Sequence, residues 1–210
     1  MTLGIAIPTY IGHLNYLTQL LDSLEQSTIL PNQVSISISS FDGELNLKDY
    51  SFEIIITKTK NRQNPCQNRN IAASKLNTDI ISFLDGDDIS HIKRNEFLIS
   101  SFENGSNAVV HNYTMNKDRN SLCYKNNIND IIFHKDYING IFPNCPFPKN
   151  INHKDYACGH ASFTKELFDK FKYNESIGWI PGEDGEILKR IVSNNIPISY
   201  IENKLSHYIK

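Results

Sequence analysis

The chain has 210 residues, of which 40% are hydrophobic, enough for one α/β domain with a substantial core. Its formal charge of -2 excludes the broad basic surface with which proteins hold nucleic acid or anionic membranes. No apolar run approaches the roughly 18 residues of a membrane-spanning helix and no signal segment precedes the first strand, so we expect a cytoplasmic protein. The four cysteines form no C-x-x-C pair, which argues against a zinc knuckle or a disulfide framework.

Strands and helices alternate through the first half of the chain. Short runs rich in β-branched residues predict strands, and apolar residues at helical spacing predict the helices between them. The predicted strands are 3–8, 34–39, 53–57, 80–84 and 108–111, and the predicted helices are 14–24, 65–76 and 92–102. Such alternation favours a mostly parallel central sheet with right-handed crossovers and flanking helices.

The fourth predicted strand ends on a cluster of carboxylates. In open α/β sheets, ligands bind at the carboxyl ends of the strands. If the chain stays extended, Asp85 and Asp87 point to one side and favour a hard divalent cation between them, while Asp88 turns to solvent or caps the next segment. An isolated motif of this kind is more often an acidic turn. An EF-hand calcium loop is excluded because Ile89 and Ser90 occupy the positions of an oxygen ligand and a glycine.

The second half of the chain is less regular. Residues 112–160 have little periodicity, and a long irregular segment in a compact domain is usually functional or mobile. Regular patterns return with predicted strands over 161–164 and 196–201 and predicted helices over 165–171 and 186–192. The acidic pair Glu183 and Asp184 precedes the last of these helices, where the helix dipole alone would also favour carboxylates.

Three motifs, in order along the chain, resemble those of nucleotide-sugar-dependent glycosyltransferases with the GT-A fold, in particular family 2. They are IAIPTY (5–10), QNRNIAASKLNTDIISFLDGDD (67–88) and GWIPGEDGEILKRI (178–191). The last is also similar to the Trp-Gly-rich motif of galactosyltransferases. The resemblance implies a single GT-A domain, with a nucleotide-binding part over about 1–111 and an acceptor-binding part over about 112–210, although it does not cover 112–157.

The activity that this resemblance implies is metal-dependent transfer of a sugar from a nucleoside-diphosphate sugar, expected to be a UDP-sugar, to a hydroxyl of a glycan or other acceptor, with inversion. Asp87, Asp85 and His207 would hold Mn²⁺ or Mg²⁺, which stabilises the departing diphosphate. Asp184 would act as the base that deprotonates the acceptor, with Glu183 as the second candidate. His207 is equally well explained as an incidental histidine near the end of this sequence.

The resemblance also implies a set of donor contacts. These residues are Pro8, Thr9, Tyr10, Asp42, Arg69, Asp85, Gly86 and Trp179. Relatives usually carry an acid at the end of the second strand, where this chain has Ser39 and Ser40, so either Asp42 takes that role or the base is held differently. Arg69 could instead be an ordinary surface arginine, and Trp179 a core tryptophan.

Two other functions compete with sugar transfer. A sugar-phosphate nucleotidyltransferase would need a glycine-rich signature after the first strand, where this chain has PTYIGH. A non-catalytic module that binds nucleotide sugars or glycans would keep the first acidic cluster but has no need of Asp184. The expected partners are therefore a donor and a carbohydrate or glycoconjugate acceptor, with no nucleic acid, and further domains could belong to a longer chain.

Overall fold

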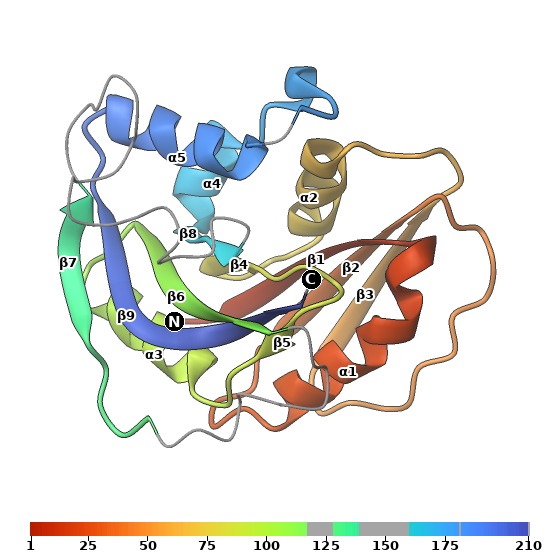
Figure 1. Ribbon diagram of the computed structural model, residues 1–210, viewed down its shortest axis with the longest axis horizontal. Coiled ribbons are helices and arrows are strands. Elements are labelled where there is room, and N and C mark those ends of the chain that lie inside the picture. Colours follow the sequence, from red (N-terminus) through yellow and green to blue (C-terminus); the bar gives the residue numbers. More distant parts are fainter. Residues whose placement is uncertain (117–127, 139–159, 181, 210) are drawn as a thin grey trace.

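The computed structural model describes residues 1–116, 128–138, 160–180 and 182–209, which form a central sheet covered by helices (Figure 1). The strands are β1 (Leu3–Tyr10), β2 (Gln33–Ser39), β3 (Glu53–Thr59), β4 (Ile80–Phe83), β5 (Ile89–Ser90), β6 (Ala108–Asn116), β7 (Phe133–Ile138), β8 (Ser162–Thr164) and β9 (Ile198–Ile209). The helices are α1 (Leu14–Glu25), α2 (Pro65–Ser74), α3 (Arg94–Glu103), α4 (Lys165–Phe171) and α5 (Glu183–Ser193).

The sheet has the strand order β3-β2-β1-β4-β8-β6-β9-β5, and β7 pairs with β9 off this path. The strands from β3 to β4 are all parallel, which confirms the parallel sheet predicted for the first half of the chain. Beyond β4 the sheet is mixed, because β8 runs antiparallel to both β4 and β6, while β6 and β9 are parallel. The fold is therefore α/β, with its regular parallel part in the first half of the sequence.

The register of the parallel strands brings their carboxyl ends to one edge. Tyr10 pairs with Ser39, which in turn pairs with Thr59. The N–H of Leu84 donates to the carbonyl of Ala6 at 3.2 Å, so the segment after β4 begins beside the end of β1. Polar residues that follow β1, β2, β3 and β4 are consequently neighbours in space although they are far apart in sequence.

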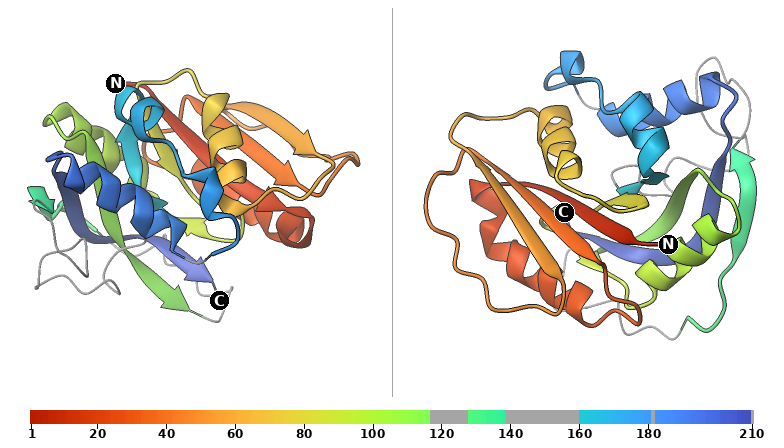
Figure 2. Two further views of the ribbon diagram at one scale, coloured as in Figure 1. Left: turned by 90° about the horizontal axis from the view of Figure 1, so that it is seen from above. Right: turned by 180° about the vertical axis from the view of Figure 1, so that it is seen from behind.

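Helices cover both faces of the sheet. Figures 1 and 2 show α1 and α3 on one face and α2, α4 and α5 on the other. On the first face the leucines Leu17, Leu20, Leu21 and Leu24 of α1 are buried in an apolar layer, and on the second face Ile187, Leu188 and Ile191 of α5 are buried in another.

Several boundaries differ from those predicted from the sequence. α5 begins at Glu183, so the acidic pair lies within its first turn, and β9 continues to Ile209. β5 and β7 were not predicted, because both are held by antiparallel pairing with β9, a non-local contact that no local pattern records. Residues 117–127 and 139–159 of the segment predicted to be irregular lie outside the described residues. None of the helices in the described ranges combines the length and apolar character that a membrane crossing requires.

Candidate active site

A cleft of about 430 Å³ opens where β1, β2 and β4 end. It gathers residues from both halves of the chain, including α5 and β9. Eight of the residues predicted to serve the site line it: Pro8, Thr9, Tyr10, Arg69, Asp85, Asp87, Trp179 and Glu183. Residues that were not predicted to line it are His13, Ser39, Ser40, Arg62, Gln63, Pro65, Asn68 and Tyr208.

The acidic motif after β4 forms a tight turn. β4 ends at Phe83, and the N–H of Asp88 donates to the carbonyl of Asp85 at 3.1 Å. The condition that the chain stays extended here is not met, because this hydrogen bond folds the segment back on itself. Asp85 and Asp87 line the cleft with side chains 26% and 22% exposed, whereas Asp88 is fully buried and does not turn to solvent.

Gly86 lies against the end of β1. Its N–H donates to the carbonyl of Pro8 at 3.3 Å, and a Cβ built on it would lie 2.5 Å from Thr9 Oγ1 and 2.7 Å from Thr9 Cβ. Thr9 is only 4% exposed, so it has little room to move away. The glycine therefore permits the close approach of the acidic turn to the end of β1.

We expect Gly86→Ala to lower the free energy of unfolding by about 1–3 kcal/mol, the usual cost of overpacking. Urea unfolding measures this change. Gly185→Ala on α5 is the matched control, because its Cβ would meet nothing within 4 Å. Equal stability of the two variants would contradict the proposed clash with Thr9.

Arg69 joins the acidic turn to the start of α5. It lies on α2, whose start is fixed by a capping box and an N-terminal proline. Its Nη2 lies 3.0 Å from Asp85 Oδ1, while Nη1 lies 2.8 Å from Glu183 Oε1 and 3.3 Å from Asp184 Oδ1. Its side chain is 5% exposed, so it is not an ordinary surface arginine. Burial alone would lower the pKa of Arg69, but these carboxylates raise it well above its usual value, and the guanidinium stays charged.

Asp184 has the environment of a base that works near neutral pH. Its side chain is 21% exposed. Its Oδ1 atom is buried and accepts no hydrogen bond from the described residues, although it lies 3.3 Å from Arg69 Nη1. Burial raises the pKa of Asp184 to about 7, with Asp85 and Glu183 adding to the increase and Arg69 opposing it. A carboxyl group with such a pKa can accept a proton from a substrate at neutral pH.

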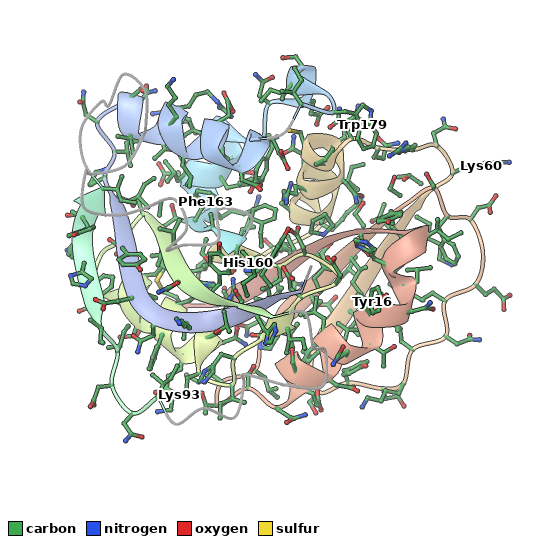
Figure 3. The ribbon with its side chains drawn as sticks, viewed as in Figure 1. Tyr16, Lys60, Lys93, His160, Phe163 and Trp179 are labelled. Atoms are coloured by element: carbon green, nitrogen blue, oxygen red, sulfur yellow. The ribbon has the colours of Figure 1, made fainter. Side chains whose placement is uncertain are left out.

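Trp179 lines the cleft, and Figure 3 shows it near α2. It is 56% exposed, which excludes the alternative of a core tryptophan. The guanidinium carbon of Arg62, from the loop before α2, lies 4.1 Å from the centre of the indole ring, so the two side chains stack on each other. Arg62 was not predicted, since nothing in the sequence links it to Trp179.

The end of β2 supplies hydroxyl groups to the cleft in place of an acid. Ser39 and Ser40 line it, and Ser39 Oγ accepts from the N–H of Gln63 at 2.8 Å. Asp42 is not among the lining residues, because its side chain is 72% exposed and lies 3.9 Å from Lys60. The structure thus does not bring Asp42 into the candidate site.

The end of β9 places Tyr208, and not His207, in the cleft. Successive side chains of a strand point to opposite faces, and Tyr208 is the one that lines the cleft. His207 is 1% exposed and pairs with Ile89 of β5. His207 is therefore not among the cleft-lining residues, and its role as a metal ligand stays a prediction. Burial raises the pKa of Tyr208, and Asp88, Asp85 and Asp87 raise it further, so its phenol remains a hydrogen-bond donor.

Two further unpredicted residues support the site. Asn68 Nδ2 donates to the carbonyl of Thr9 at 2.8 Å, and its Oδ1 accepts from Ser37 at 2.6 Å, which ties the end of β1 to β2 through α2. Asn68 precedes Arg69 in the second motif, and this position could have identified it as a site residue from the sequence. His13 Nδ1 lies 3.4 Å from Asp87 Oδ2, a contact between distant segments that no pattern could have predicted.

The carboxylates that face the cleft suit a divalent cation. Asp85 and Asp87 offer the oxygen ligands that Mg²⁺ and Mn²⁺ prefer. The side chains of Asp85, Asp88 and His160 also have ligand atoms within 4.8 Å of one another. However, His160 Nε2 and Asp88 Oδ2 are hydrogen-bonded at 2.6 Å and both side chains are buried. Of these residues, Asp85 and Asp87 are the ones that a phosphate-bound cation could reach.

Comparison with known proteins gives one family and one fold. A family model described as glycosyl transferase family 2 matches residues 4–173. A search of curated proteins finds no match. S. aureus TarS 1-349 in complex with UDP is similar in structure, with a TM-score of 0.67 and 13% sequence identity, over 100% of this chain and 61% of that chain.

Two further solved structures give the same result. S. aureus TarS 1-349 in complex with UDP-GlcNAc has a TM-score of 0.67 and 14% identity, over 100% of this chain and 59% of that chain. S. aureus TarS has a TM-score of 0.67 and 13% identity, over 100% of this chain and 37% of that chain. The chain thus spans about three fifths of the length of TarS 1-349. At such identities the likeness concerns the fold.

Proposed function

The chain belongs to glycosyl transferase family 2 and has the GT-A fold, and on this premise we propose that it moves a sugar from a nucleoside-diphosphate sugar to a hydroxyl of a glycan or other acceptor. The observation that carries the proposal is the ion-pair cluster that Arg69 forms with Asp85, Glu183 and Asp184. Through Arg69, the donor-side Asp85 and the base candidate Asp184 belong to one ion-pair group beside a single cleft. Sugar transfer needs these two kinds of carboxylate close together.

The donor end of the cleft is proposed to lie at the turn after β4. Asp87 and Asp85 would hold Mn²⁺ or Mg²⁺, which supplies positive charge to the departing diphosphate when bound. Tyr208, whose phenol stays protonated, faces the same carboxylates and is placed to donate to a phosphate oxygen. The sugar would then extend from the diphosphate toward α5.

The base end is proposed to lie at the first turn of α5. The acceptor hydroxyl attacks the anomeric carbon as the bond to the diphosphate oxygen breaks, and Asp184 takes the hydroxyl proton. Glu183 is held by Arg69 at 2.8 Å, so we propose a supporting role for it. One displacement with one base inverts the anomeric configuration. Trp179, which lines the cleft and is exposed, offers an apolar face to the sugar ring.

The nucleobase is proposed to lie over the ends of β1 and β2. Pro8, Thr9 and Tyr10 line that part of the cleft, together with Ser39 and Ser40. The similar TarS structures hold UDP and UDP-GlcNAc, which supports UDP as the nucleotide. We also propose the division of the chain into a nucleotide-binding part, about 1–111, and an acceptor-binding part, about 112–210.

A non-catalytic binding module remains the second candidate. It would use the same donor end, but it has no need of a buried carboxyl whose pKa is raised to about 7 by burial. Retention of Asp184 in that environment favours an enzyme.

A panel of nucleoside diphosphates tests the proposal. We expect UDP to raise the melting temperature more than GDP or TDP, and more with Mn²⁺ than with EDTA, because the carboxylates repel the diphosphate unless a cation intervenes. Thermal unfolding measures the shift, and release of UDP from UDP-GlcNAc in the presence of glycan acceptors measures turnover. Absence of any nucleotide effect would contradict the proposed function, and binding without turnover would favour the binding module.

A further inference from the structure

A buried polar bridge lies behind the acidic turn and is not used by the proposed chemistry. His160 Nε2 lies 2.6 Å from Asp88 Oδ2, and His160 Nδ1 lies 2.7 Å from Ser206 Oγ. The side chains of Asp88 and His160 are 0% and 1% exposed, and Ser206 is fully buried. Figure 3 shows His160 in the interior of the molecule, near β8. We call these three residues the His160 bridge.

The hydrogen-bonding roles in the bridge follow from its chemistry. Burial lowers the pKa of His160 to about 4, so the ring is neutral and carries one proton. A carboxylate can only accept, so Nε2–H donates to Asp88, and Nδ1 accepts from the hydroxyl of Ser206. One ring nitrogen therefore donates to Asp88 and the other accepts from Ser206.

The backbone on both sides of the bridge is held by a second buried group. Arg94 Nη2 donates to the carbonyl of Phe83 at 3.0 Å and to the carbonyl of His160 at 3.3 Å. Arg94 Nε donates to His111 Nε2 at 2.9 Å. Arg94 thus holds the end of β4, just before the acidic turn, at a fixed distance from the backbone of His160.

The bridge connects two elements that both reach the cleft. Asp88 closes the turn through its N–H to Asp85, which orients the two carboxylates of the donor end. Ser206 lies on β9 two residues before Tyr208, which faces the same carboxylates. His160 comes from neither element, yet it is hydrogen-bonded to both.

We propose that His160 is a positioning residue that fixes the acidic turn against β9 and so sets the cation affinity of the donor end. This inference rests on the proposed function. His160 supports the turn from behind: it is not among the cleft-lining residues, and its Nε2 is engaged by Asp88 at hydrogen-bonding distance.

Two substitutions separate the two halves of the bridge. In His160→Gln the side-chain amide can reach the position of Nε2 and donate to Asp88, while in His160→Asn the shorter side chain can accept from Ser206 but cannot replace the Nε2–H donation to Asp88. We expect His160→Asn to raise the Mn²⁺ concentration for half-saturation of UDP binding by about 10–100-fold, the usual effect of losing a group that orients a metal ligand. His160→Gln should stay close to the unsubstituted protein.

The measurement is a Mn²⁺ titration of UDP binding, with kcat at saturating Mn²⁺ and the melting temperature recorded for each variant. His134→Gln is the matched control, since His134 also contacts a carboxylate, Glu202 at 3.2 Å, but at the surface on β7. Ser206→Ala, which removes one hydroxyl and no ring, gives a second test in which a smaller rise in half-saturation is expected.

The outcomes are distinct. Equal weakening by His160→Gln and His160→Asn would make His160 a metal ligand and overturn the positioning role. Lower melting temperatures with unchanged Mn²⁺ half-saturation would leave only a structural role and would also overturn it. If the unsubstituted protein binds UDP but every variant matches it, the inference alone fails. If the unsubstituted protein binds no nucleotide, the proposed function itself fails.

Discussion

Asp184→Asn is expected to lower sugar transfer by about 10²–10⁴-fold, the usual contribution of general-base catalysis, while UDP affinity stays close to that of the unsubstituted protein. The amide keeps the size of the carboxyl group but cannot take a proton at neutral pH. Because Arg69 retains two carboxylate partners, Asp85 and Glu183, it remains compensated in the variant. Initial rates of transfer and equilibrium UDP binding, measured on the same preparations, test both halves of this prediction.

The pH dependence provides an independent check of Asp184. Its pKa is raised to about 7, chiefly by burial, so kcat/KM should fall as the pH drops below about 7 and this limb should vanish in Asp184→Asn. Stability should change in the opposite sense. With the folded-state pKa above the ordinary 3.8, the folded state binds more protons in that window, and this contribution to stability is lost as the pH rises from about 4 to 7.

Two results would contradict the assignment of Asp184. One is transfer by Asp184→Asn at a near-normal rate. The other is a product whose anomeric configuration, determined by NMR, is the same as that of the donor, because a single displacement with one base must invert it.

Asp87→Ala is expected to abolish most of the Mn²⁺-dependent stabilisation by UDP. For the unsubstituted protein at UDP concentrations about 100 times Kd, ligand binding adds about 2.7 kcal/mol, which corresponds to roughly 5–11 °C in melting temperature for a domain of this size. Asp87 is partly exposed and lies in the cleft, so its removal should change the nucleotide-free melting temperature little.

Thermal unfolding with UDP, in Mn²⁺ and in EDTA, measures the effect of Asp87→Ala. Asp169→Ala is a suitable control, because Asp169 is a half-exposed carboxylate on α4 whose ion pair is with Lys165. An undiminished Mn²⁺-dependent shift in Asp87→Ala would exclude Asp87 as a ligand of the cation.

The parts of the site that could be predicted from sequence depend on local patterns. The apolar run of β4 ends on carboxylates, and the carboxyl ends of parallel strands share one edge of the sheet, so the place of Asp85 and Asp87 followed from the pattern. Their orientation did not, because one backbone hydrogen bond turns the segment after β4. The same residues are compatible with a turn and with an extended chain, so the sequence does not distinguish the two.

The parts that could not be predicted depend on long-range pairing. Tyr208 faces the cleft instead of His207 because of the register of β9, and a shift of one residue would exchange the two. Asp42 was favoured by chemistry and sequence proximity, yet the chain after β2 carries it to solvent. His160 stands out only once β4 and β9 are seen on either side of it.

The ion-pair cluster around Arg69 also bears on the order in which reactants arrive. One guanidinium faces three carboxylates, those of Asp85, Glu183 and Asp184, and Asp87 adds another negative charge beside them. When these groups are ionised, the cleft has an excess of negative charge and repels a free diphosphate. On the proposed function, a divalent cation would offset that repulsion, so we expect the donor to enter as its cation complex or after the cation. The charge of the cleft would thus require the cation to bind no later than the donor. Removal of the cation by a chelator would then prevent donor binding itself and not only a later step.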